Sequence, residues 1–245
     1  MGMLNIDEHV EEHRVLAIRY PDKAVMLGQT IPFPGFSPRL IASLVANSTA
    51  ACASGVVTVT ATSHGITATT FDGMQFYYPG SPSLAAGWYS GFARTSANEI
   101  TFAAPSADDF TSESVNAGSA FTAEVTVFSS TLPPNSLSVG NILSCRLFRI
   151  ADAVSSAHLT NVKADGNVFS RSTVSTPSNQ GAFNLSGSVL NSTTLRGMSS
   201  TDNVLGSTAL SATIDIGSSI EISLTSSVAA AGMFICISSA TMRIE

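Results

Sequence analysis

Apolar and polar residues alternate along most of the chain in short runs that predict β-strands. The first part contains four such runs, at 55–62, 74–79, 87–94 and 98–104, separated by clusters of Gly, Pro, Ser and Asn that favour turns. The second part contains seven more, at 121–128, 141–150, 158–164, 182–190, 207–216, 219–225 and 233–244. A two-residue period places alternate side chains on opposite faces of a strand. The pattern therefore predicts an all-β protein.

Breaks in this pattern predict four segments. We expect an extended N-terminal attachment arm at 1–39, a small antiparallel β-domain at 40–106, a polar linker at 107–120 and a β-sandwich or jelly roll at 121–245. The four runs of the small domain are expected to pair as a meander.

The predicted arm has two parts. Residues 6–18 are acidic and predict a short helix, which Asp7 would cap. Prolines and glycines between 20 and 39 exclude a continuous helix or a central strand. Because Phe33 and Phe36 also lie there, we expect this stretch to be ordered against another protein surface; the alternative is a disordered tail.

Composition narrows the range of functions. Charged residues make up only 11% of the chain, about half or less of the usual share, while Ser, Thr and Asn, which disfavour helices, are abundant. The net charge is −6 with two lysines, so we expect no nucleic-acid partner, because phosphate binding requires clustered cations. The N-terminus lacks the layout of a secretory signal, and the longest apolar run, 228–237, is too short for a membrane-spanning helix. Synthesis in a cytoplasm without membrane insertion is expected.

Few residues are candidates for chemistry. His9 and His13 share a helical face with Glu12, but the order is not that of a zinc-protease helix, and a solvated acidic helix is the favoured interpretation. Asp108 and Asp109 resemble half of a glycosidase pair, yet adjacent strand residues face opposite ways. We interpret them as solubilising residues of the linker.

The stretch SHGITATTFDG (63–73) offers a choice between chemistry and turns. His64 and Asp72 could form an acid–base pair, or His64-Gly65 and Asp72-Gly73 could be two turns. In the turn interpretation Gly65 adopts a positive φ angle, and Asp72 bonds to its own backbone.

Cysteines and aromatic residues also have two interpretations each. Cys52, Cys145 and Cys236 are expected to be buried free thiols rather than disulfide or metal ligands. An aromatic group in the small domain is expected to anchor its core, with a glycan-stacking surface as the alternative. It consists of Tyr77, Tyr78, Trp88, Tyr89 and Phe92.

Two stretches resemble structural proteins of tailed-bacteriophage virions. The run 56–103, with His64-Gly65, Asp72-Gly73, Gly87-Trp88-Tyr89 and Ile100-Thr101-Phe102, resembles a small β-domain that recurs in such proteins. The stretch STLPPNSLSVGNILSCRLFRI (130–150), followed by SNQGAF (178–183) and Thr201-Asp202, resembles phage trimeric jelly rolls of the capsid decoration, cement or head-spike type, which are related to those of tail fibres.

This resemblance implies a function. We expect a non-enzymatic capsid decoration or cement protein of the virion, a homotrimer made in a bacterial cytoplasm and bound to the major capsid protein through its arm. No catalytic residue, cofactor or metal is expected. One alternative is a tail-fibre or tail-tip adhesin that binds host surface glycan. A further alternative is a polysaccharide-degrading enzyme, for which His158 has no obvious partner.

Overall fold

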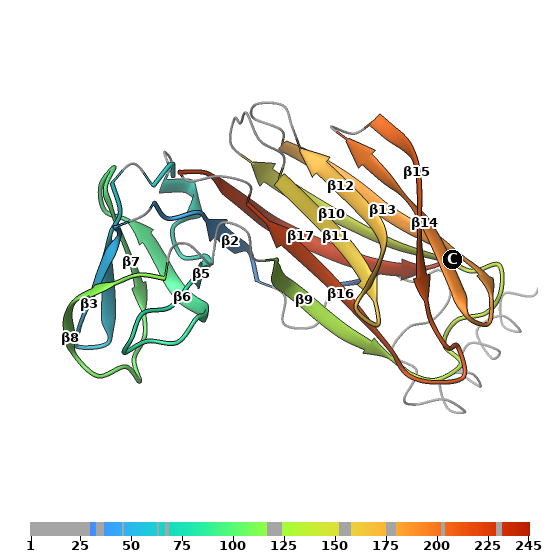
Figure 1. The fold of residues 1–245 in the computed structure, drawn as a ribbon, viewed down its shortest axis with the longest axis horizontal. Coiled ribbons are helices and arrows are strands. Elements are labelled where there is room, and N and C mark those ends of the chain that lie inside the picture. Colours follow the sequence, from blue (N-terminus) through green and yellow to red (C-terminus); the bar gives the residue numbers. More distant parts are fainter. Residues whose placement is uncertain are drawn as a thin grey trace, which may run out of the picture.

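The computed structural model describes residues 30–32, 37–45, 47–62, 64–66, 69–116, 124–151, 158–174, 180–201, 204–228 and 232–245. This part of the chain is all-β, with one short 3-10 turn, η1 (Thr69–Phe71). Figure 1 shows a small β-domain at one end and a larger β-sandwich at the other. The helix predicted at 6–18 lies outside the described residues, as do His9, His13 and most of the predicted arm.

The larger unit is a β-sandwich of two hydrogen-bonded layers, as the sequence predicts. One layer has the order β17-β10-β13-β14-β15 and the other the order β9-β16-β11-β12. β14 also pairs in parallel with β12, so hydrogen bonding continues from one layer into the other on that side. The strands are β9 (Val125–Leu132), β10 (Ile142–Ala151), β11 (His158–Ala164), β12 (Asn167–Val174), β13 (Gln180–Asn191), β14 (Thr194–Thr201), β15 (Val204–Thr213), β16 (Ile220–Ser227) and β17 (Phe234–Ile244).

The small domain is a curved antiparallel sheet with the order β8-β3-β4-β7-β6-β5. The four predicted runs are present, but the predicted meander is wrong, because β4 pairs with β3 and β7 instead of with β5. The predicted linker is also wrong for residues 110–114, which form β8 and pair with β3. The strands are β3 (Thr49–Ala53), β4 (Val56–Thr60), β5 (Gln75–Tyr78), β6 (Gly87–Arg94), β7 (Glu99–Ala103) and β8 (Phe110–Ser114).

One strand connects the two units. β2 (Arg39–Ala42) pairs antiparallel with β17 of the sandwich and parallel with β5 of the small domain. The ladder continues past its end, where Ser43 N–H donates to Met233 O over 2.7 Å. Figure 1 shows β2 between the two units. The backbone hydrogen bonds therefore run without a break from one unit into the other.

The side chains at this junction alternate between two hydrophobic cores. On β2, Leu40 and Ala42 belong to the core of the small domain, while Ile41 belongs to the core of the sandwich. On β17, Phe234 and Cys236 face the small domain, and Ile235 and Ile237 face the sandwich. A strand buried on both faces is an unbroken apolar run, and LIA (40–42) and FICI (234–237) have that pattern.

Part of the predicted arm lies on the sandwich itself. β1 (Thr30–Pro32) pairs antiparallel with β17, and Thr30 lies opposite Arg243. Residues 30–32 and 39 are therefore integrated into the sheet of their own chain.

The backbone at Gly65 lies so close to Gly232 that a substitution there tests the contact between the two units. A Cβ atom at Gly65 would lie 1.6 Å from the carbonyl oxygen of Gly232, so the loop of the small domain touches the chain just before β17. Gly65 and Gly73 both have positive φ angles, 80° and 84°, but a Cβ at Gly73 would meet nothing within 4 Å. The two glycines therefore differ mainly in packing.

We expect Gly65→Ala to destabilise the protein far more than the matched Gly73→Ala. The positive φ angle alone costs about 1–2 kcal/mol at either site. At Gly65 the backbone clash adds about 1–3 kcal/mol more, since no side-chain rotation relieves it. Urea unfolding midpoints would measure both losses, and equal losses would contradict the close contact.

Candidate functional site

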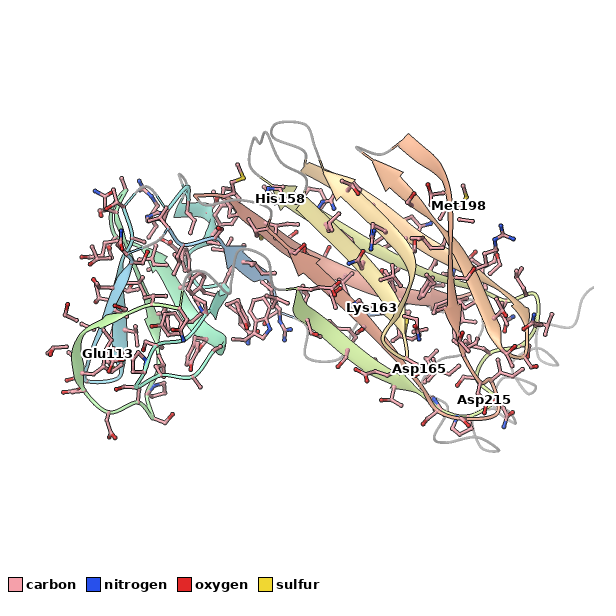
Figure 2. All side chains as sticks on the ribbon, viewed as in Figure 1. Glu113, His158, Lys163, Asp165, Met198 and Asp215 are labelled. Carbon is pink, nitrogen blue, oxygen red and sulfur yellow. The ribbon has the colours of Figure 1, made fainter. Side chains whose placement is uncertain are left out.

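The polar residues of the described chain are spread over both units. Figure 2 shows Glu113 in the small domain, whereas His158, Lys163, Asp165 and Asp215 are distributed along the sandwich. Among the described residues, no three His, Cys, Asp or Glu side chains come close enough together to hold a metal ion. No described segment forms a helix of the length and apolarity needed to cross a bilayer.

His64 is a buried structural residue. Its Nδ1 accepts a hydrogen bond from Ile66 N–H over 3.1 Å, so the ring proton is on Nε2, which lies 3.0 Å from Ser96 O and donates to it. Burial lowers the pKa of His64, and the nearby Arg94 charge lowers it further, while the Ser96 hydrogen bond opposes these effects. The neutral imidazole fastens the 64–66 loop to residue 96.

Asp72 stabilises backbone rather than pairing with His64. Asp72 Oδ1 accepts a hydrogen bond from Arg94 N–H over 3.0 Å, and Arg94 Nε donates to Ile66 O over 2.8 Å. The two turns carry the positive φ angles expected at Gly65 and Gly73. The expected bond of Asp72 to its own turn is replaced by this longer-range bond to β6.

The acidic residues around β8 also support turns. Asp109 Oδ1 accepts a hydrogen bond from Ser54 N–H over 2.7 Å, at a turn where Ser54 and Gly55 both have positive φ angles. Glu113 accepts from both the backbone N–H and the hydroxyl of Ser83, and these bonds lower its pKa. Asp108 and Asp109 are thus exposed residues next to β8 in the small domain.

The aromatic group fills the small domain and the junction. Tyr78 and Phe92 are fully buried, which confirms core packing for these two rings. Tyr77 and Trp88 instead pack against the sandwich core, 5.4 Å apart between centroids. Trp88 Nε1–H donates to Thr126 O on β9 over 3.0 Å, and the guanidinium of Arg39 lies 4.8 Å from the Trp88 ring. These contacts fix β6 against the sandwich.

All three cysteines are buried free thiols, as the sequence predicts. Burial raises the pKa of Cys145 and of Cys236 to about 12. Cys236 Sγ lies 3.5 Å from Met74 Sδ, within the core that the small domain shares with β17. A thiol with such a pKa remains protonated near neutrality and is a poor nucleophile.

Arg149 is a buried cation that the sequence analysis missed. Its guanidinium donates to Thr160 Oγ1 on β11 over 3.1 Å and to Ser172 Oγ on β12 over 3.2 Å. It also lies 3.9 Å from the ring centroid of Phe183 on β13. Because a buried cation is costly unless polar partners surround it, this arrangement ties the two layers together. The sequence did contain a sign of this role, because Arg149 is a charged residue at a position of β10 that faces the core.

A second polar cluster, also missed, lies between β9, β11 and β16. The Glu124 carboxylate accepts hydrogen bonds from Lys163, Asn161 and Thr225. Burial raises the pKa of Glu124, but these hydrogen bonds together outweigh burial and leave the pKa below its ordinary value. Since both carboxylate oxygens are engaged, this group is a closed ion pair rather than an available base.

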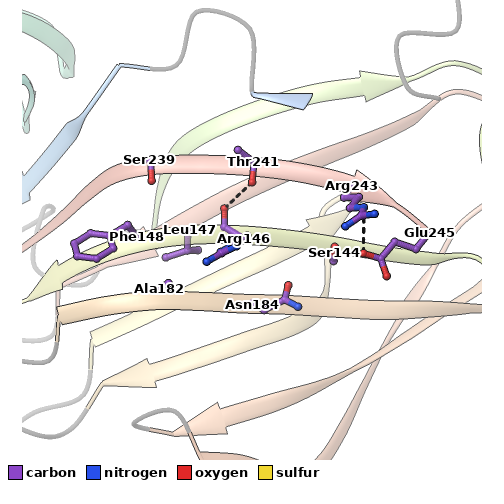
Figure 3. Close-up of a pocket in the computed structure, with 10 residues that line it drawn as sticks. All are labelled: Ser144, Arg146, Leu147, Phe148, Ala182, Asn184, Ser239, Thr241, Arg243 and Glu245. Atoms are coloured by element: carbon purple, nitrogen blue, oxygen red, sulfur yellow. Dashed lines mark hydrogen bonds and ion pairs between the residues drawn. The ribbon is translucent and has the colours of Figure 1, made fainter. Parts of the chain in front are cut away.

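A groove lies on the outer face of the sandwich, lined by described residues of three strands. Three rows of directly opposed residues cross β17, β10 and β13, and each row shares one face of the sheet. The rows are Ser239–Phe148–Ala182, Thr241–Arg146–Asn184 and Arg243–Ser144–Ser186. Small side chains at Ser144, Ala182 and Ser239 leave a hollow of about 670 Å³ between the longer ones. We call it the β10 groove, and Figure 3 shows it.

The β10 groove has an excess of positive charge in a protein of net charge −6. Arg146 lies in the middle row and makes no ion pair with a described residue, whereas Arg243 Nε lies 3.3 Å from Glu245 Oε1. Phe148 at the end of β10 is 39% exposed. The sequence carried a signal here, because Phe148 is apolar at an outward position where Ser144 and Arg146 are polar.

Comparisons of the chain with protein-family models, with curated proteins and with solved structures found no match. The β10 groove offers guanidinium, hydroxyl and amide groups around one exposed aromatic ring.

The neutral, buried His64 predicts a pH dependence of stability. Its folded pKa lies below the ordinary value of 6.5, so below pH 6.5 the unfolded chain binds a proton more readily. Keeping His64 neutral therefore contributes to the free energy of unfolding. The contribution is fully present above pH 6.5 and is lost as the pH falls towards the pKa of His64 in the folded protein. Through this one residue, the free energy of unfolding falls by at most about 1.4 kcal/mol for each pH unit.

We expect His64→Gln, which keeps a donor for Ser96 but does not titrate, to lose less stability on acidification than the wild type. Urea unfolding between about pH 7.5 and about pH 5.5, a window above most carboxylate pKa values, measures the two slopes. Identical slopes would show that His64 protonates equally in both states.

Proposed function

We propose that this protein is a non-enzymatic structural component of a tailed-bacteriophage virion, and specifically a capsid decoration or cement protein. Its N-terminal residues would bind the major capsid protein, and its sandwich would project from the head. The virion assignment comes from the sequence resemblance, and the observation that supports a rigid structural role is the unbroken hydrogen-bonded path β5-β2-β17, which joins the two units. Two domains that open and close over a substrate do not share a strand in this way.

The position of β1 supports attachment through the N-terminus. β1 pairs with the edge of β17, so the chain reaches the sandwich at Thr30. The 29 residues printed before this point include five acidic and three basic residues. A partner that binds only the assembled shell stabilises it by mass action, by about 4 kcal/mol per site at a thousandfold excess over Kd. Homotrimer formation, which the jelly-roll resemblance implies, would multiply the number of attachment points.

A second candidate is a tail-fibre or tail-tip adhesin that binds host surface glycan. The β10 groove favours it, because an exposed ring beside hydroxyl, amide and guanidinium groups suits a sugar ligand. The two candidates differ in which part of the chain makes the decisive contact.

A binding experiment separates them. Labelled protein would be offered separately to undecorated phage heads and to host cells, together with a variant lacking residues 1–29. This deletion leaves β1 and β2 in place, so the described fold is retained. A groove variant, Arg146→Ala, serves as the matched control with an intact N-terminus.

For a decoration protein we expect saturable binding to heads that the deletion abolishes and Arg146→Ala leaves unchanged. Binding to cells but not to heads, which survives the deletion and is weakened by Arg146→Ala, would identify the adhesin. Binding to neither heads nor cells would overturn both candidates.

A further inference from the structure

The central residue of the β10 groove is equipped to hold an anion. Arg146 lies between Thr241 and Asn184 in the middle row, and its side chain is exposed. The guanidinium is always charged and presents a planar fork of donors that matches a carboxylate. Because no described carboxylate pairs with it, Arg146 is available to a ligand. Arg243, at the other end, already shares its charge with Glu245.

The remainder of the groove suits a sugar. The Phe148 ring is partly exposed at one end, where it offers an apolar face to the C–H groups of a pyranose. Asn184, Ser239 and Thr241 line the same hollow with amide and hydroxyl groups, which exchange hydrogen bonds with sugar hydroxyls. Phe148 and Ser144 are four residues apart on β10, which corresponds to about 14 Å along the strand. Figure 3 shows this line of side chains along β10 and β17.

We propose that the β10 groove binds an acidic oligosaccharide, a short sugar chain that carries carboxylate groups. Arg146 holds a carboxylate, Phe148 packs against a neighbouring ring, and the amide and hydroxyl groups orient the chain. This inference rests on the groove alone and holds for a protein on either the head or the tail of a virion.

The same geometry is unsuited to a subunit interface. A stable interface buries about 800 Å² on each partner around an apolar centre. In the β10 groove the centre is Arg146, and Phe148 is the exposed large apolar side chain that lines it. Two copies joined face to face by a twofold axis through the groove would place one Arg146 guanidinium against the other. A small polar ligand meets neither difficulty.

Calorimetric titration of the full chain tests the proposal. The acidic probes are tri-galacturonate, tri-guluronate and a hyaluronan tetrasaccharide, and maltotriose is the neutral probe. We expect an acidic probe to bind at about 20 mM NaCl and to weaken at about 200 mM, where charges are screened more strongly. Maltotriose is expected to bind much more weakly and without dependence on salt.

Three substitutions in the groove locate the site, and a fourth outside it is the control. Arg146→Ala is expected to weaken the acidic probe about tenfold or more, since a charged hydrogen-bonding pair is lost. Phe148→Ala is expected to weaken it about fivefold through loss of the ring contact. Glu245→Gln is expected to strengthen it, because Arg243 is released from its ion pair.

The matched control is Arg196→Ala, which removes the same charge outside the groove. Arg196 pairs with Ser188, about 14 Å further along the strands than Asn184. The two arginine variants are compared at about 150 mM NaCl, where this separation exceeds the screening length of about 8 Å. We expect less than about a twofold effect at this distance. Equal unfolding midpoints establish that all four variants are folded, since these side chains are exposed.

Three results would overturn the proposal. The first is that none of the acidic probes binds the wild type, and the second is that Arg146→Ala binds as tightly as Arg196→Ala. The third is a lower oligomeric mass of Arg146→Ala or Phe148→Ala in sedimentation equilibrium, which would assign the groove to contact with a second copy of the chain.

Discussion

The hydrogen bonds that β2 makes on both of its edges are the constraint on which the rest of the structure depends. β5 lies on one edge and β17 on the other, so β2 belongs to both units. The alternation of side chains then assigns Leu40 and Ala42 to one core and Ile41 to the other. A domain of this size buries limited apolar surface by itself, and β17 supplies it with Phe234 and Cys236. The two cores are consequently stabilised by the same short strands.

The sequence predicted the fold class and most strands because most strands have one buried face. Every predicted run of the sandwich overlaps an observed strand, and 158–164 coincides with β11. β12 and β14 were missed for a physical reason. β12 buries Ser170 and Ser172 as well as Phe169, and Ser172 accepts a hydrogen bond from the Arg149 guanidinium, so polar residues interrupt the apolar alternation of this strand. On β14, a Cβ at Gly197 would lie 2.3 Å from Phe169 O, so the close approach of β12 requires glycine there.

The alternation of apolar and polar residues shows where a strand lies but not which other strand it pairs with. The sequence therefore could not predict the order of strands in each sheet. The meander expected in the small domain failed for this reason: β4 pairs with β7, which follows it by some 40 residues. The sequence could not assemble the groove for a related reason, since Ser239, Phe148 and Ala182 become neighbours only through the register of three strands. For His64 and Asp72, by contrast, the sequence left an acid–base pair and two turns as alternatives, and the structure has the turns.

The edge of β17 opposite β10 has a consequence for self-association. β2 covers its residues 234–237, β1 covers 241–243, and the bulge at Ser238 interrupts the ladder between them. β1 is only three residues long and ends in Pro32, which has no N–H to offer an incoming strand. The longest edge of this layer is therefore closed to strand addition. Edge-to-edge pairing of two copies through β17, the kind of contact from which cross-β aggregation starts, is thereby hindered.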